Sequence, residues 1–161
     1  MKGQLSIEYY ISLILFVFFI VYLSFQIVKI TPTYIRELKN ENLRIEAYQL
    51  SELLINDPGE PINWDSQPQV KRIGLSSNEN KTNLLSGNKI AAMKTKCSTN
   101  YEDVRRLIGT EYYFSLFLTN ETLRQTICQP TNFPVRETNT TITRVVAIDD
   151  NSIGNLSLFV W

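Results

Sequence analysis

The chain has 161 residues, with 16 Lys or Arg against 16 Asp or Glu, so its formal net charge at pH 7 is zero, and it has no histidine. The charge balance gives no basic field for a nucleic acid, and the missing histidine removes the commonest catalytic base and metal ligand. No G-x-S-x-G, Walker or G-x-G-x-x-G motif is present. We therefore expect a protein that is not an enzyme and that needs no metal or cofactor.

The first predicted element is an apolar run without a single charge, over residues 9–28. A helix of this length spans roughly 30 Å, the thickness of one bilayer core. The run is longer than the apolar part of a secretory signal peptide, and no A-x-A-like cleavage site follows it. We expect a membrane helix, for which a plain signal anchor is one alternative.

The residues just ahead of this run form a specific pattern, Gly3-Gln4-Leu5-Ser6-Ile7-Glu8. Glu8 stands at the lip of the expected membrane helix, where a carboxylate is costly unless it is paired. The pattern resembles the archaeal type IV pilins with class III (prepilin-type) signal peptides, in the group marked by Q-x-S-x-E. That family often has Leu four residues after the Glu, whereas this chain has Ser12.

The resemblance implies that a prepilin peptidase cuts between Gly3 and Gln4 and leaves the apolar helix on the mature chain. Ser6 and Glu8 then belong to the assembly region, and the partners are other pilin subunits that pack through their N-terminal helices. Glu8 would pair with the new amine of Gln4, unless Gln4 cyclises to a neutral ring. The alternative role for Glu8 is a carboxylate favoured by the helix dipole.

A second helix is expected over residues 34–55. Thr31 and Pro32 precede it and would kink or loosen the helix at the membrane exit. Four apolar residues then recur at helical spacing, and Asn56-Asp57-Pro58-Gly59 ends the helix. The members of this stripe are Leu43, Ala47, Leu50 and Leu54.

The remaining chain predicts a head of small helices and strands. We expect a short strand over 70–75 and helices over 89–96 and 101–108, the second capped by Asn100 and ended by Gly109. Further strands are expected over 111–119, 123–128, 141–148 and 153–161. A turn at Asp149-Asp150-Asn151 joins the last two, and a calcium site there is the alternative to a solvated turn. The expected core residues of the head are Ile73, Leu75, Ile90, Val104 and Leu107.

This order predicts an α+β fold: a long N-terminal hydrophobic helix, pilin-like, continuing into an amphipathic helix packed on a small antiparallel β-sheet head domain. The expected divisions are a leader over 1–3, a membrane or filament-core helix over 4–30, its amphipathic extension over 31–57 and the head over 58–161.

Two further features suit a head outside the cell. Cys97 and Cys128 predict one disulfide, with two free buried thiols as the alternative. Four Asn-x-Ser/Thr triplets are candidate N-glycosylation sites. Their asparagines are Asn80, Asn120, Asn139 and Asn155.

Two functions remain open on the sequence. The first is a structural subunit, pilin or minor pilin, of an archaeal type IV pilus-like surface filament, with an adhesive role for its head also open. Such a subunit sits in the membrane before assembly and in an extracellular filament afterwards. The alternative is a membrane-anchored monomeric binding or receptor-like protein. The sequence names no surface ligand.

Overall fold

The fold is described from a computed structural model. It describes residues 4–77, 83–120, 123–131, 139–149 and 152–161, with side chains from Ile7 onward. The chain consists of two compact units, Met1–Lys39 and Asn40–Trp161.

Helix α1 extends over Gln4–Asn56 and has Pro32 in its interior. Proline has no N–H to donate to the carbonyl one turn back, and next to it the Thr31 hydroxyl donates to the Ile27 carbonyl at 2.7 Å. The helix continues through Pro32 to Asn56, and the kink or loosening expected there stays a prediction. The predicted C-terminal end of the helix is confirmed, because α1 ends at Asn56. Gly59 follows with a φ of +85°, a conformation that suits glycine.

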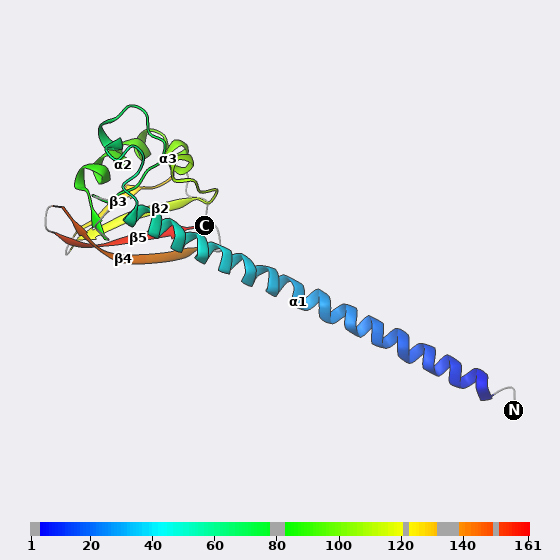
Figure 1. Cartoon of the computed structure of the whole chain (residues 1–161). Coiled ribbons are helices and arrows are strands. Elements are labelled where there is room, and N and C mark those ends of the chain that lie inside the picture. Colours follow the sequence, from blue (N-terminus) through cyan, green and yellow to red (C-terminus); the bar gives the residue numbers. More distant parts are fainter. Residues whose placement is uncertain (1–3, 78–82, 121–122, 132–138, 150–151) are drawn as a thin grey trace. The chain divides into compact units, whose positions relative to one another are not determined.

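The second unit contains a five-stranded sheet, with strand order β1-β4-β5-β2-β3 (Figure 1). Strands β2 to β5 pair antiparallel, whereas β1 pairs parallel with β4. The α+β prediction is thus confirmed, with a mixed sheet. The strands are β1 (Leu84–Leu85), β2 (Phe114–Asn120), β3 (Leu123–Cys128), β4 (Thr140–Ile148) and β5 (Ile153–Val160).

Both predicted small helices are present. Helix α2, Gly87–Thr99, is longer than expected, whereas α3 has the expected bounds, Tyr101–Ile108. The Asn100 side chain accepts a hydrogen bond from the Asp103 N–H, and Gly109 ends α3 in the left-handed conformation. The caps assigned to α3 from the sequence are confirmed.

The prediction of a strand over 70–75 is wrong, because within the described chain this segment makes only one isolated bridge, Glu60↔Arg72, and Ser76 just after it makes another with Leu85. Its backbone bonds to helices and loops instead. The Trp64 indole N–H donates to the Gly74 carbonyl at 2.8 Å, and the Leu75 N–H donates to the Leu54 carbonyl at 2.9 Å. A 3-10 turn, Trp64–Ser66, carries that indole.

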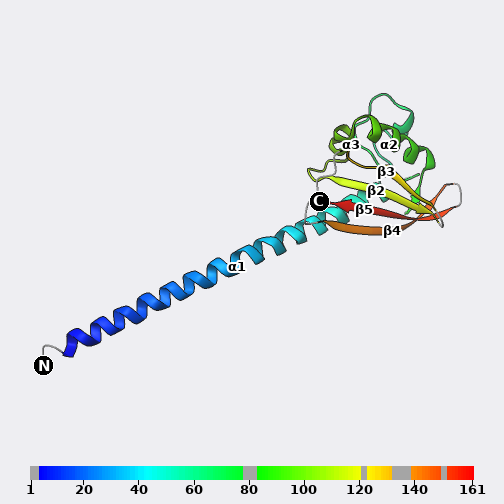
Figure 2. The same ribbon diagram turned by 180° about the vertical axis from the view of Figure 1, so that it is seen from behind.

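The core lies between one face of the sheet and the helices. Figures 1 and 2 show α2 and α3 on the same side of the sheet. The expected α1 stripe is buried, as are four of the five expected head residues, and Leu107 is partly buried against them. The sheet contributes every second residue of its central strands, Phe114, Leu116, Leu118, Leu156, Leu158 and Val160.

Candidate functional site

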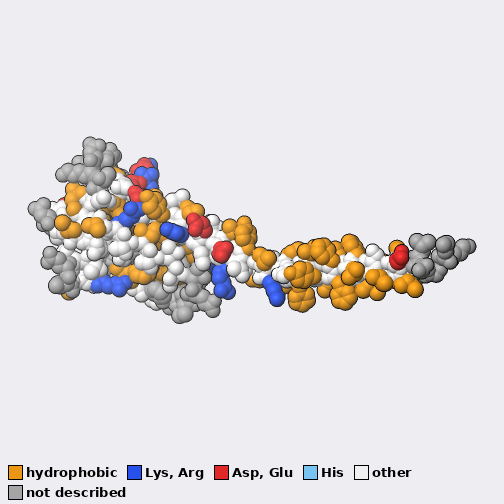
Figure 3. Space-filling view, turned by 90° about the horizontal axis from the view of Figure 1, so that it is seen from below, with side chains coloured by type: hydrophobic (Ala, Val, Ile, Leu, Met, Phe, Trp, Pro, Cys, Tyr) orange, Lys and Arg blue, Asp and Glu red, His pale blue; other side chains and the backbone are white. Residues whose placement is uncertain are grey.

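The apolar segment of α1, residues 9–28, is exposed along its whole length in the unit Met1–Lys39. Figure 3 shows hydrophobic side chains along most of this part of the helix. Phe18 is 69% exposed and Phe25 is 66% exposed. Of the helices in the described chain, α1 is the one long and apolar enough to cross a membrane, and its most apolar stretch buries nothing. It is a candidate membrane anchor.

Polar side chains within this segment bond inside the helix. The Ser24 hydroxyl donates to the Ile20 carbonyl at 2.9 Å, and the Gln26 amide donates to the Tyr22 hydroxyl at 2.9 Å. These bonds lower the cost of placing polar groups in an apolar environment.

Glu8 is the charged residue directly before this segment, and its side chain is exposed. No other side chain of the described chain forms an ion pair with it. Gln4 and Ser6 lie in the first turns of α1, and Gly3 lies outside the described residues. The cleavage and assembly roles of these four residues stay predictions.

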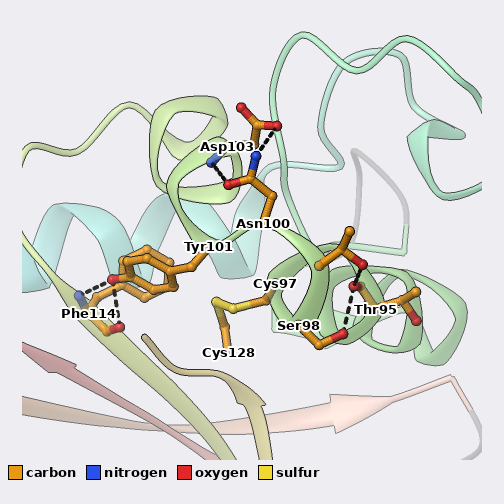
Figure 4. Close-up of a disulfide and its surroundings, with 9 residues drawn as sticks. Thr95, Cys97, Ser98, Asn100, Tyr101, Asp103, Phe114 and Cys128 are labelled. Carbon is orange, nitrogen blue, oxygen red and sulfur yellow. Dashed lines mark hydrogen bonds between the residues drawn. A yellow bond between two sulfur atoms is a disulfide. The ribbon is translucent and has the colours of Figure 1, made fainter. Parts of the chain in front are cut away.

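A disulfide joins Cys97 of α2 to Cys128 of β3, with 5.4 Å between the two Cα atoms. Both cysteines are buried. Figure 4 shows the bond beside the Asn100 cap and the Tyr101–Phe114 contact. The disulfide predicted from the sequence is confirmed, and the alternative of two free thiols does not hold in this structure.

The candidate glycosylation sites differ in their surroundings. Asn139 and Asn155 are exposed, just before β4 and on β5, and Asn120 is half-buried at the end of β2. Asn80 lies outside the described residues. Attachment of sugars to any of them stays a prediction.

The turn at 149–151 is described only at Asp149, whose carboxylate accepts a hydrogen bond from the Gly87 N–H at 3.0 Å. Asp150 and Asn151 lie outside the described residues. Across the described chain, no group of three potential metal ligands comes together. The calcium alternative for this turn gains no support.

The burial of Lys89 was not predicted from the sequence. Lys89 is 4% exposed, and its ammonium donates to the Pro58 carbonyl at 2.7 Å and to the Ser76 carbonyl at 2.8 Å. Desolvation lowers the pKa of Lys89, although Asp65 and Asp57 oppose this shift. Its spacing of four and eight residues from Met93 and Cys97 was the signal, since it places Lys89 on the apolar face of α2.

No protein-family model, no curated protein and no solved structure matches this chain. Its function is therefore argued from its own residues.

Proposed function

We propose that this chain is a structural subunit, pilin or minor pilin, of an archaeal type IV pilus-like surface filament. One observation carries the proposal. The uncharged apolar segment of α1, residues 9–28, is exposed over its whole length and directly follows the pattern Gly3-Gln4-x-Ser6-x-Glu8.

Two properties of α1 support this function. The apolar segment is long enough to hold the subunit in a bilayer before assembly. The same helix continues without a break to Asn56, where its buried stripe belongs to the core of the second unit. Helices that leave lipid gain no hydrophobic energy by packing together, so packing and polar pairs such as one through Glu8 must drive assembly.

The partners under this proposal are other copies of the subunit, the prepilin peptidase and, before assembly, the membrane. The head lies outside the cell, where the disulfide persists in an oxidising environment. No catalytic role or cofactor forms part of the proposal.

The decisive experiment is the intact mass and N-terminal sequence of the protein from its native membrane or filament fraction. We expect a mature chain that starts at Gln4 and lacks two hydrogens at Cys97 and Cys128. A chain that still starts at Met1 and stays monomeric in detergent would reject the filament subunit. The membrane-anchored binding protein, which the exposed apolar helix also allows, would then take its place.

The role of Glu8 is tested by Glu8→Ala in the full chain, with Ser12→Ala as the matched control one turn further along. We expect Glu8→Ala to leave cleavage at Gln4 intact and to block filament formation, because the carboxylate next to the apolar segment is lost and can no longer form a polar pair. Ser12→Ala should assemble as the wild type does. Normal filaments from Glu8→Ala would remove this role from Glu8.

A further inference from the structure

The amide of Gln26 is a polar group of the apolar segment whose hydrogen-bonding capacity is only partly used. An amide has two N–H donors and one carbonyl acceptor, and one of these donors bonds to the Tyr22 hydroxyl at 2.9 Å. The Tyr22 hydroxyl still has its own proton to donate. Within the described chain neither side chain makes a further hydrogen bond. By contrast, the single hydroxyl proton of Ser24 is already donated to the Ile20 carbonyl.

The Tyr22–Gln26 pair is directed into the apolar segment. Side chains on a helix lean toward its N-terminus, so Gln26 reaches back over the turn that carries Tyr22 and not forward to Lys29. Under the proposed function this segment lies in lipid before assembly. Lipid tails offer no hydrogen-bonding group, so the unused amide and hydroxyl groups are costly there unless another protein chain meets them.

Gln26 belongs to one continuous face of α1, which we call the Gln26 face. Its residues follow one another at alternating spacings of three and four. Two helices that pack side by side meet along a line of residues with this spacing. The residues of the Gln26 face are Ser12, Leu15, Phe19, Tyr22 and Gln26.

The Gln26 face is open in the described part of the unit Met1–Lys39. Leu15 is 65% exposed, Phe19 57% and Tyr22 59%. Large apolar side chains form its middle, and the Tyr22–Gln26 pair forms one end. Glu8 continues the face one turn before Ser12, at the lip of the segment, and its carboxylate stays free for the assembly role proposed above. A partner must therefore offer apolar contacts at the middle and hydrogen-bonding groups at the depth of Gln26.

A second copy of this chain meets both requirements. Copies inserted into one membrane share one orientation, so a neighbouring α1 runs parallel and presents the same side chains at the same depth. An amide both donates and accepts, which makes Gln26 and Tyr22 complementary to the same pair in the other copy. A polar residue at such a position also fixes the register of paired helices.

We propose that two copies of this chain pair in the membrane, before assembly, through the Gln26 face. The inference rests on the membrane stage of the proposed function. In this pair the Tyr22 and Gln26 side chains of the two copies hydrogen-bond across the contact, and Leu15 and Phe19 pack along it.

Cysteine crosslinking of the full chain tests the contact. Both native cysteines form the disulfide, so a cysteine introduced into α1 is the free thiol of the variant. Phe19→Cys places this thiol at the middle of the Gln26 face. Val17→Cys is the matched control, because residues two positions apart on a helix lie at nearly the same depth but about 200° apart around the axis.

Native membranes are oxidised with copper phenanthroline, and the disulfide-linked dimer is measured. We expect at least about tenfold more dimer from Phe19→Cys than from Val17→Cys, because thiols on the far sides of two packed helices cannot meet. Equal yields from the two variants, dimer from Val17→Cys only, or no dimer overturns the inference. An adduct of Phe19→Cys with a different protein overturns it as well.

Gln26→Leu in the Phe19→Cys background tests the hydrogen bonds across the contact. We expect the dimer yield to fall about threefold or more, as for the loss of a hydrogen bond between membrane helices. Ser24→Leu in the same background is the control, because that hydroxyl donates within its own helix, and it should leave the yield unchanged. Equal membrane levels and an intact Cys97–Cys128 disulfide show that both variants insert and fold. An unchanged yield from Gln26→Leu overturns the inference, since the amide is what selects this face.

The two proposals fail in different ways. A wild-type chain that starts at Gln4 and forms filaments, while Phe19→Cys gives no dimer, overturns the pairing and leaves the proposed function standing. A wild-type chain that starts at Met1 and forms no filament rejects the proposed function itself, whatever the crosslinking yields.

Discussion

At the scale of single residues, buried polar side chains form hydrogen bonds with backbone groups that are not paired within a helix or between strands. Tyr101 is the clearest case, because its hydroxyl accepts from the Phe114 N–H at 2.8 Å and donates to the Phe114 carbonyl at 3.0 Å. Lys89 does the same for two carbonyls outside α2. Each of these side chains joins segments far apart in the sequence.

Tyr101 makes stability depend on pH in the alkaline range. Burial raises its pKa from 10.0 to about 12, since the folded protein favours the neutral phenol. Its contribution to stability is therefore complete below pH 10 and is lost as the pH rises from 10 towards 12. We expect the free energy of unfolding to fall over this window in the wild type and to fall less in Tyr101→Phe. Chemical unfolding at several pH values measures it, with Tyr113→Phe as control, and equal slopes in all three chains would contradict the assignment.

Lys89→Met keeps the length of the side chain but leaves the Pro58 and Ser76 carbonyls without its ammonium. We expect the free energy of unfolding to fall by about 1–3 kcal/mol, because buried acceptors lose their donor. The control is Lys94→Met on the same helix, where the lysine is exposed and the change should be small. If both variants unfold at the same urea concentration, the buried ammonium contributes nothing.

At the scale of elements, the disulfide ties α2 to β3 across a sequence separation of 31 residues. Strand β3 is an edge strand that pairs only with β2 within the described sheet. A crosslink from a helix to this edge limits the freedom of the strand when the chain unfolds, which is where most of the gain arises in the chain-entropy view.

We therefore expect the double variant Cys97→Ala and Cys128→Ala to lose about 3–4 kcal/mol of unfolding free energy. Urea unfolding of the full chain in detergent measures this loss, and a reducing agent should bring the wild type close to the variant. The agent should leave the variant itself unchanged. If the reducing agent lowers the unfolding free energy of the wild type and of the variant equally, it does not act through the Cys97–Cys128 disulfide.

At the scale of the whole molecule, the candidate anchor and the folded unit have opposite surface chemistry. Every described side chain of the apolar segment is at least partly exposed, whereas the second unit has a buried apolar core that includes Trp64 and Phe114. Under the proposed function, retention in a membrane would depend on residues 9–28 and not on the head.

Phe18→Arg tests that dependence near the middle of the apolar segment. An arginine at the centre of a membrane helix costs about 2.5–3.5 kcal/mol on the insertion scale, so we expect less of the full chain to remain in the membrane pellet after an alkaline carbonate wash. Tyr34→Arg, beyond the segment, is the control and should pellet as the wild type does. Wild-type retention of Phe18→Arg would contradict the anchor.

Local pattern was sufficient for much of this fold. The uncharged run, the stripe from Leu43 to Leu54 and the caps Asn100 and Gly109 each depend on residues within a few positions of one another. The same holds for the alternation that predicts the central strands, and two cysteines leave only one intramolecular pairing. These features could be predicted because helix and strand periods repeat within one element.

Tertiary structure decided what depends on distant residues. The segment 70–75 forms no strand because the carbonyl of Leu54 and the indole of Trp64 bond to its backbone groups. Strand β1 joins the sheet in parallel through β4, more than 60 residues away. The sequence by itself determined that residues 9–28 of α1 are apolar and uncharged. Only packing determined that Leu43 is covered and Tyr48 is not, because burial depends on which segments the whole chain brings against each face.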